Sequence, residues 1–169
     1  NSIAGLPEGT VRGSLDGSAT LISGMKDPIL IADIMMDSLS MNGYTAPRLR
    51  LNSAWDFATE RAGLSLVNTA DGKTLVRGFY RPDTNSYAAT VDIDGIPLAA
   101  ANPFLPADVI RSVEGTTALY LELRGSKGMP KMNGTLSVSD FSTTIGITDV
   151  TYSTPTLDID IDGGTVRLP

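Results

Sequence analysis

One acidic motif combines residue types and a spacing that could bind a metal ion: Asp158-Ile159-Asp160-Ile161-Asp162-Gly163. It matches the first six positions of a calcium-binding loop, in which carboxylates at alternate positions surround the ion. The glutamate that closes such a loop is absent, because residue 169 is proline. The aspartates also alternate with Leu157, Ile159 and Ile161, which predicts the wet face of an extended strand. We therefore expect no metal site, with calcium held by Asp158, Asp160 and Asp162 as the weaker alternative.

The composition removes most catalytic chemistry. The chain has no histidine and no cysteine, so it lacks the usual zinc ligands, cysteine nucleophiles and the base of a Ser/His/Asp triad. Paired carboxylates could cleave a glycosidic bond, but they must lie roughly 5 to 10 Å apart across a cleft. No spacing selects such a pair among the scattered candidates Asp33, Asp37, Asp56, Glu60, Glu114 and Glu122. We expect a protein that is not an enzyme and that uses no cofactor.

The charge of the chain limits its partners. Its formal net charge of -6 repels phosphate backbones and anionic lipid headgroups. No apolar run approaches the roughly 20 residues that span a bilayer. We therefore expect no nucleic-acid partner and no membrane insertion by this segment. Because the chain begins at Asn1 without methionine, and both ends lie in or beside strand-like patterns, we expect residues 1–169 to be a single segment of a longer protein.

Alternation of apolar and polar residues is the main pattern along the chain. Roughly ten runs show it, and a period of two is typical of strands with one apolar and one wet face. In one such run Ala89, Val91 and Ile93 alternate with Thr90, Asp92 and Asp94. Asp71-Gly72 separates two further runs, and both residues tolerate the positive φ of a tight hairpin turn. The sequence predicts an all-β fold whose sequential strands pair as an antiparallel meander.

A long passage of the chain occurs twice. Residues 13–28 and 115–130 both place a proline fifteen residues after a glycine, and a small residue, Ala32 or Gly134, follows four positions later. Repetition at a long period is typical of elongated architectures. We expect two repeat-like units at about residues 9–57 and 103–168, joined by a β-meander at about 58–102.

Two further features refine the predicted sheet. Leu105, Val109 and Val113 have helical spacing, and two nearby prolines suit a first helical turn, which predicts one short helix near residues 104–113. Small residues such as Gly17, Ala19 and Ala89 occupy apolar positions of the strands. Glycine in a strand marks a bend or a close approach, so we expect an elongated, curved sheet with space above its apolar face.

The second copy contains a series of runs with a recognisable order: Phe104-Leu105-Pro106-Ala107-Asp108, Val113-Glu114-Gly115, Leu121-Glu122-Leu123-Arg124-Gly125 and Pro130-Lys131-Met132-Asn133-Gly134-Thr135-Leu136. This series resembles the TamB family, especially its Bacteroidetes branch, whose repeats have the form G-x-L-x-G-x-L-x-L-x-G followed by P-x-L-x-G-x-L. The first copy is similar, with Ala32 in place of the expected glycine. The resemblance covers roughly residues 9–52 and 103–168, and the middle of the chain is compatible with it.

The resemblance implies a curved sheet, called a β-taco in this family, that forms an apolar trough. TamB-like proteins are similar to AsmA-like and bridge-like lipid transfer proteins. They are anchored in the inner membrane of Gram-negative bacteria, cross the periplasm and meet a TamA-like assembly barrel at the outer membrane. Two roles are attached to the family: transport of phospholipid along the trough, and assembly or secretion of outer-membrane proteins. The resemblance therefore predicts a periplasmic segment that takes part in outer-membrane biogenesis.

The expected clients of this segment are phospholipid acyl chains or nascent outer-membrane β-strands. The residues expected to line the trough are apolar strand positions of the second copy: Leu119, Leu121, Leu123, Leu136, Val138, Ile145, Ile147, Leu157, Ile159 and Ile161. A β-sandwich binding module of a secreted or surface protein, dependent on glycan or calcium, is the alternative from another functional class.

Overall fold

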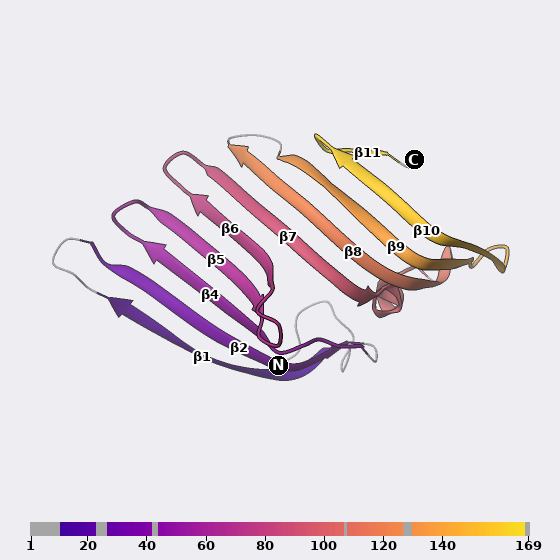
Figure 1. The fold of residues 1–169 in the computed structure, drawn as a ribbon, viewed down its shortest axis with the longest axis horizontal. Helices are drawn as coiled ribbons and strands as arrows, with labels where there is room; N and C mark the ends of the chain where they lie inside the picture. Colours follow the sequence, from indigo (N-terminus) through magenta and orange to yellow (C-terminus); the bar gives the residue numbers. More distant parts are fainter. Residues whose placement is uncertain (1–10, 23–26, 42–43, 107, 127–129, 168–169) are drawn as a thin grey trace.

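The fold is a single open antiparallel sheet (Figure 1). The computed structural model describes residues 11–22, 27–41, 44–106, 108–126 and 130–167. Eleven strands follow one another across the sheet in chain order, except that the short β3 pairs only with β2. Each pairing is antiparallel. The predicted all-β meander is confirmed.

The strands in the first half of the sheet are β1 (Val11–Ile22), β2 (Ile29–Met41), β3 (Tyr44–Thr45), β4 (Leu49–Asp56), β5 (Arg61–Asn68) and β6 (Thr74–Arg81). Those in the second half are β7 (Ser86–Pro97), β8 (Ile110–Ser126), β9 (Lys131–Ile145), β10 (Val150–Asp162) and β11 (Thr165–Arg167). One 3-10 helix, η1 (Leu98–Phe104), connects β7 to β8.

The strand register separates an apolar face from a polar face, because directly paired residues point to the same side of a sheet. One row of paired residues crosses nine strands and carries no polar side chain: Gly17, Ile34, Leu51, Leu66, Val76, Val91, Leu121, Gly134 and Ile161. The adjacent row points the other way and is polar throughout: Ser18, Asp33, Asn52, Ser65, Arg77, Thr90, Glu122 and Asn133. The alternation seen in the sequence thus becomes two opposite surfaces.

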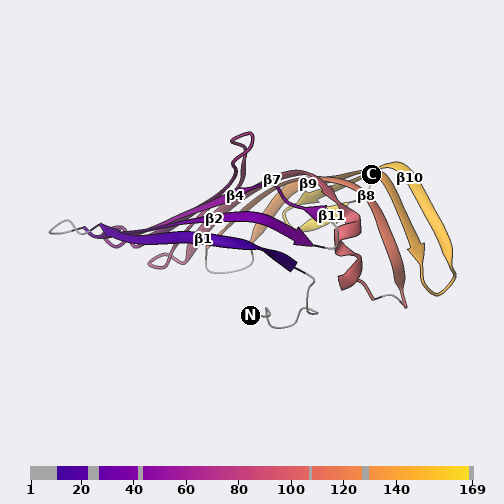
Figure 2. The same cartoon turned by 90° about the horizontal axis from the view of Figure 1, so that it is seen from below.

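The sheet is curved and forms a single layer. Figure 2 shows the strands arching, with the ends of β8, β9 and β10 turned down and η1 beneath the arch. Among the described residues only Leu49, Ala100 and Val138 are buried hydrophobic residues, at 8%, 3% and 2% exposure. Ala100 lies in η1 and Val138 on the apolar face of β9, so we infer that η1 covers this end of the apolar face. The rest of that face has no second layer of described residues above it.

Both repeat copies form the same bulged hairpin. The register between β1 and β2 shifts between Arg12 and Ser14, and the register between β8 and β9 shifts between Glu114 and Thr116. Each shift thus surrounds the glycine that begins a copy. On the opposing strands Ser38 and Asp140 adopt positive φ, at 55° and 53°. The repeated passage therefore encodes a repeated local bend, which strengthens strand twist at both places.

The short helical segment lies earlier than predicted. The sequence predicts a helix near residues 104–113, whereas η1 ends at Phe104 and β8 begins at Ile110. Ile110, Ser112 and Val113 pair with β9 instead. Two helical turns in isolation are marginal, and β-branched side chains favour strands, so sheet pairing prevails over the helical spacing. The predicted position of the helix is therefore wrong.

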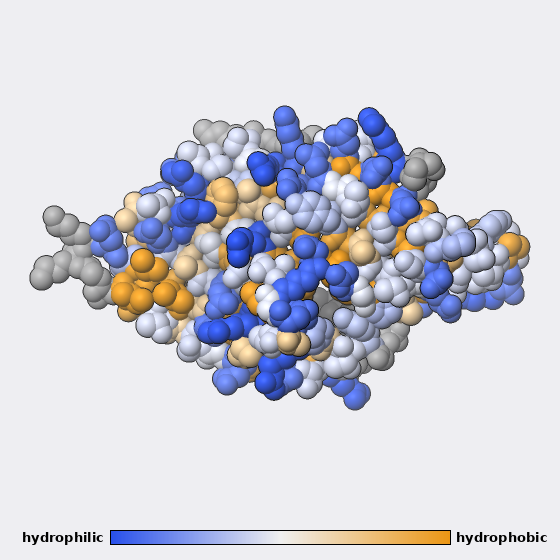
Figure 3. Space-filling model, in the orientation of Figure 1, coloured by the Kyte–Doolittle hydropathy of each residue, from blue (hydrophilic) through white to orange (hydrophobic). Residues whose placement is uncertain are grey.

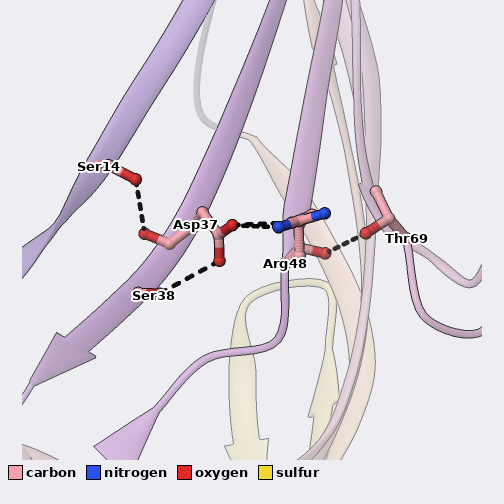
Figure 4. Close-up of polar contacts among 5 residues, drawn as sticks. All are labelled: Ser14, Asp37, Ser38, Arg48 and Thr69. Atoms are coloured by element: carbon pink, nitrogen blue, oxygen red, sulfur yellow. Dashed lines mark hydrogen bonds and ion pairs between the residues drawn. The ribbon is translucent and has the colours of Figure 1, made fainter.

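Polar groups tie the first strands together at the end of the sheet away from the β1–β2 loop (Figure 4). The Ser14 hydroxyl donates a hydrogen bond to the main-chain oxygen of Asp37 at 3.4 Å, and the Ser38 hydroxyl donates one to the Asp37 carboxylate at 3.2 Å. Arg48 Nε donates to Asp37 Oδ2 at 3.0 Å, while Thr69 donates to the main-chain oxygen of Arg48 at 3.0 Å. These bonds connect β1 and β2 with the residues flanking β4 and β5.

Replacement of Gly134 by alanine should destabilise the sheet. An added Cβ at Gly134 would overlap the main-chain oxygen of Tyr120 and lie 2.9 Å from Leu121 Cα. Backbone cannot move aside as a flexible side chain can, so we expect a loss of about 1–3 kcal/mol in the free energy of unfolding. Denaturant unfolding followed by circular dichroism measures it.

The matched control is Gly63→Ala, because the nearest atom to an added Cβ there is the main-chain oxygen of Gly78 at 4.0 Å. That variant should unfold at or slightly above the wild-type midpoint. Equal midpoints for the Gly134 and Gly63 variants would contradict this account of β8–β9 packing.

Candidate functional site: an apolar groove

A furrow crosses the strands on the apolar face. Its floor is one row of directly paired residues, most of which have small side chains: Ala32, Ser53, Leu64, Gly78 and Ala89. Leu64 is the large residue of this row and remains 44% exposed. Since side chains of one row stand side by side, a row of small residues between larger ones leaves a channel perpendicular to the strands.

Larger side chains border this floor on both sides. The row nearer the β1–β2, β4–β5 and β6–β7 turns contains Leu30, Trp55, Tyr80 and Tyr87, with Ala62 between the tryptophan and the first tyrosine. The row on the other side contains Ile34, Leu51, Leu66, Val76 and Val91. The first wall is therefore aromatic, and Val76 is the residue of the aliphatic row that lines the hollow.

The hollow between these rows, which we call the groove, has a volume of about 410 Å³. This lies within the range of roughly 300–1,000 Å³ that is usual for small-molecule sites. The residues that line it come from β2 and from β4 to β8, and none carries a charge. The hydroxyl of Tyr80 donates a hydrogen bond to Asn85 Oδ1 at 3.1 Å, at the edge of the groove. An uncharged hollow of this kind binds hydrocarbon better than any polar group.

The structure places most of the residues predicted for the trough on the same apolar face, but beside the groove. Direct pairing joins Leu119, Leu136 and Ile159 in one row and Leu121 and Ile161 in another. Val138 pairs with Leu157 and is 2% exposed, so it offers no surface to a ligand. Of the predicted residues only Leu123 lines the groove.

Two of the predicted trough residues lie elsewhere. Ile145 is the last residue of β9, and Ile147 lies in the turn before β10, where it is 78% exposed. The sequence pattern places Ile145 and Ile147 on one strand face, and this is wrong because the strand ends between them.

The groove lies mainly in the middle of the chain, which the sequence predicts only as a meander. Leu30, Leu64, Tyr80 and Tyr87 are not among the predicted site residues, and for Trp55 core packing is the sequence-based expectation. The feature of the sequence that could have predicted the groove is the Asp71-Gly72 turn, because strands that pair on either side of this turn place Leu64 opposite Gly78. This pairing also requires the register shift between Leu66 and Val67, which no residue type in the sequence predicts.

The aspartates of the calcium-like motif lie on β10. Asp158 and Asp160 pair with Ser137 and Thr135, on the polar face. The Arg167 guanidinium lies 3.9 Å from the Asp162 carboxylate. Within the described ranges no three acidic side chains come close enough together to hold a metal ion.

Charged pairs gather on the polar face. Arg50 Nε donates to both carboxylate oxygens of Asp33, at 2.9 and 3.1 Å, and this hydrogen bonding lowers the pKa of Asp33. Lys73 Nζ lies 2.7 Å from Asp94 and 2.9 Å from Asp92, and its hydrogen bonds to them raise the pKa of Lys73. Figure 3 shows one face of the molecule, on which hydrophilic side chains are spread among hydrophobic patches. The charge of the chain is thus segregated from the groove.

Comparison of the chain with protein-family models, curated proteins and solved structures gave no match. Across the described residues, no helix has both the length and the apolar character needed to cross a membrane.

Removal of the Asp33 carboxylate should weaken the fold in a pH-dependent way. The folded-state pKa of Asp33 lies below the usual value of 3.8 because Arg50 donates hydrogen bonds to it. Its contribution is therefore present above that value and is lost as the pH falls towards the lowered pKa. We expect Asp33→Asn to be less stable than wild type at neutral pH, by a small amount because the pair is solvent-exposed. The difference should vanish in acid, as measured by denaturant unfolding at several pH values.

Asp158→Asn serves as the control, since no ion pair joins Asp158 to another described residue. An Asp33→Asn deficit that stays constant from neutral pH into acid would refute the role given to this pair.

Proposed function

We propose that this chain binds phospholipid acyl chains in its groove and serves as a non-enzymatic, lipid-carrying segment of a TamB-like envelope protein. The observation that carries the proposal is an uncharged groove on an apolar sheet face that no second layer of described residues covers. Transfer of an acyl chain into such a hollow contributes about 0.8 kcal/mol for each buried methylene. Binding of this kind needs no catalytic group.

The direction of the groove supports transport in addition to storage. The floor crosses the strands, so the groove runs along the direction in which further strands would extend the sheet. Hydrocarbon contacts are non-directional, and a chain can slide over them without breaking hydrogen bonds. The lipid headgroup would remain in water above the open groove, while the charged side chains of the polar face keep the other side of the sheet hydrated.

The wider role follows from the resemblance to the TamB family. In this proposal the segment lies in the periplasm, the parent protein is anchored in the inner membrane of a Gram-negative bacterium, and a TamA-like barrel is the partner at the outer membrane. Lipid carried along the sheet would then supply outer-membrane biogenesis.

A second candidate client is a nascent outer-membrane β-strand, and the open sheet edges favour it. β1 pairs only with β2, so one side of a twelve-residue strand is unpaired among the described residues. Residues 150–159 of β10 likewise pair on one side only within the described part of the chain, because β11 reaches no further than Asp160. An extended peptide could add to either edge through main-chain hydrogen bonds.

The β-sandwich module requires two packed sheets, whereas the described strands form one. Glycan- or calcium-dependent binding has no specific structural observation in its favour.

Photo-crosslinking residues on the groove floor should capture phospholipid in cells. We expect capture from benzoylphenylalanine at Leu64 or Ala89, because both line the groove. The matched controls are Ser65 and Thr90, their chain neighbours on the polar face. Mass spectrometry of the adducts identifies the client. Lipid adducts from the controls alone would exclude the groove, and peptide adducts from a further probe on β1 would favour the strand client.

Filling the groove should reduce lipid capture. Ala89→Phe places a large ring on the floor, beside Gly78 and Leu123. We expect a severalfold loss of the lipid adduct at Leu64, because the ring takes the volume of several methylenes. Thr90→Phe, which points to the polar face, controls for folding and should leave capture unchanged. Undiminished capture in the Ala89→Phe variant would show that lipid lies elsewhere.

A further inference from the structure

A second hollow lies on the polar face of the sheet, over β5 to β8. In this part of the face β7 contributes the small residues Ser86, Ala88 and Thr90. The neighbouring strand β6 contributes the larger Arg77 and Phe79, which pair with Thr90 and Ala88. Small side chains between larger ones leave a depression, here with a volume of about 560 Å³. We call it the arginine hollow.

The lining of the arginine hollow is basic. Among the described residues, three arginines and no acidic residue line it: Arg61 on β5, Arg77 on β6 and Arg124 on β8. This reverses the balance of the whole chain, in which 19 acidic residues outnumber 13 basic ones. Three residues that carry hydroxyl groups also line the hollow, Ser86, Thr90 and Ser126. The hollow therefore offers an anion many hydrogen-bond donors and no repelling charge.

The three arginines can still donate hydrogen bonds to a ligand. Neither Arg61 nor Arg77 forms an ion pair with another described residue. The Arg61 guanidinium lies 4.5 Å from the centroid of the Phe79 ring, and stacking of this kind orients the group without using its N–H donors. Arg124 lies 3.6 Å from the Glu122 carboxylate with its side chain 76% exposed, and such exposed pairs are weak.

The carboxylates nearest to the hollow on the polar face are held by other groups. Glu122 accepts a hydrogen bond from the Tyr120 hydroxyl at 2.8 Å. Asp92 lies 2.9 Å from Lys73 Nζ. Their charges are thus partly satisfied outside the arginine hollow, which leaves the guanidinium groups to an external anion.

A fourth arginine lies beside the hollow and lacks one partner. Arg81 pairs with Ser86, and it lines an adjoining depression together with Asp56, whose carboxylate accepts a hydrogen bond from the Thr59 hydroxyl at 2.8 Å. Arg81 Nη2 donates to Asp83 at 2.9 Å, but Arg81 Nε is buried and has no hydrogen-bond partner among the described residues. An unpaired buried donor is costly, so an acceptor placed here by a ligand would stabilise it.

We propose that the arginine hollow binds the phosphomonoester group of an organic phosphate. A planar carboxylate is satisfied by one or two guanidinium groups, whereas a phosphate presents oxygens in several directions. Arginines that approach from β5, β6 and β8 therefore suit a phosphate better. The volume of the hollow lies within the roughly 300–1,000 Å³ of small-molecule sites and exceeds what a bare phosphate fills. The organic part of the ligand would pack against Phe79 and Ala88.

The arginine hollow and the lipid groove are separate sites. The register places the three arginines on the face opposite to the groove floor, and neither site lends a charged group to the other. The phosphate site thus goes beyond the proposed carriage of acyl chains and does not depend on it. Lipid capture at Leu64 and Ala89 reports on the groove alone, so either proposal can fail while the other holds.

Titration of the full chain with glucose 6-phosphate and with adenosine monophosphate, followed by calorimetry at constant ionic strength, tests the site. We expect saturable binding of at least one of these esters and none of glucose or adenosine. Inorganic phosphate should bind severalfold more weakly, since it cannot contact Phe79. Equal affinity for inorganic phosphate would overturn the role given to Phe79, and binding of neither ester nor of the lipid ester below would overturn the site.

The double variant Arg61→Gln/Arg77→Gln removes two of the guanidinium groups. Both residues are exposed, so the fold should persist, which circular dichroism checks. We expect the affinity to fall about tenfold or more, because a hydrogen bond to a charged group contributes about that factor. The matched control, Arg12→Gln/Arg167→Gln, removes the same charge from exposed positions on the two outermost strands, β1 and β11. It should bind like wild type, and an equal loss in both double variants would overturn the proposal.

Phosphatidic acid carries the same phosphomonoester group on a lipid, so it distinguishes a headgroup from a soluble ligand. Flotation with phosphatidic acid vesicles that Arg61→Gln/Arg77→Gln abolishes would assign the site to a lipid headgroup. Binding of a soluble ester without flotation would assign it to a soluble phosphate. Both outcomes support the phosphate site, whereas flotation that the variant leaves unchanged, without binding of a soluble ester, would overturn it.

Discussion

A one-layer sheet satisfies its backbone hydrogen bonds without burying its apolar face, and this constraint governs the molecule. Ladder bonds between neighbouring strands hold the eleven strands in order. Among the described residues only three hydrophobic side chains are buried, those of Leu49, Ala100 and Val138. Apolar surface that a second layer would normally cover therefore stays accessible. The open groove on the apolar face is a consequence of this missing layer.

Small residues decide how the uncovered face is shaped. Where Ala32, Gly78 and Ala89 stand in one register row the surface sinks, and where Trp55 and Tyr87 stand in the next row it rises. The opposite face carries the ion pairs, so the sheet remains wet on one side. A second layer of protein would fill the groove permanently, whereas a bound hydrocarbon chain, as we propose, would cover the same surface reversibly.

The sequence predicts the strands well and the groove poorly. Alternation and turn residues act locally, so the all-β meander and the close approach at Gly134 could be derived from them. The rows of the groove depend on the register of six strands. A bulge such as the one between Leu66 and Val67 shifts this register, and no residue type in the sequence predicts the bulge. The predicted helix failed for a related reason: Val113 has helical spacing, but its pairing with Thr143 decides its conformation. The predicted trough residues belong to the second copy, whereas the groove is lined mainly by residues of the central meander and of the first copy.

The most direct test of the central claim is to locate a bound acyl chain by nuclear magnetic resonance, using the protein with labelled alanine methyl groups and a protonated phospholipid. The account predicts intermolecular Overhauser effects from acyl methylenes to Ala32, Ala62 and Ala89, which line the groove on three different strands. It predicts none to Ala118, which pairs with Asp94 and Ser137 on the polar face. Contacts to Ala118 equal to those on the groove floor, or no contacts at saturating lipid, would contradict it.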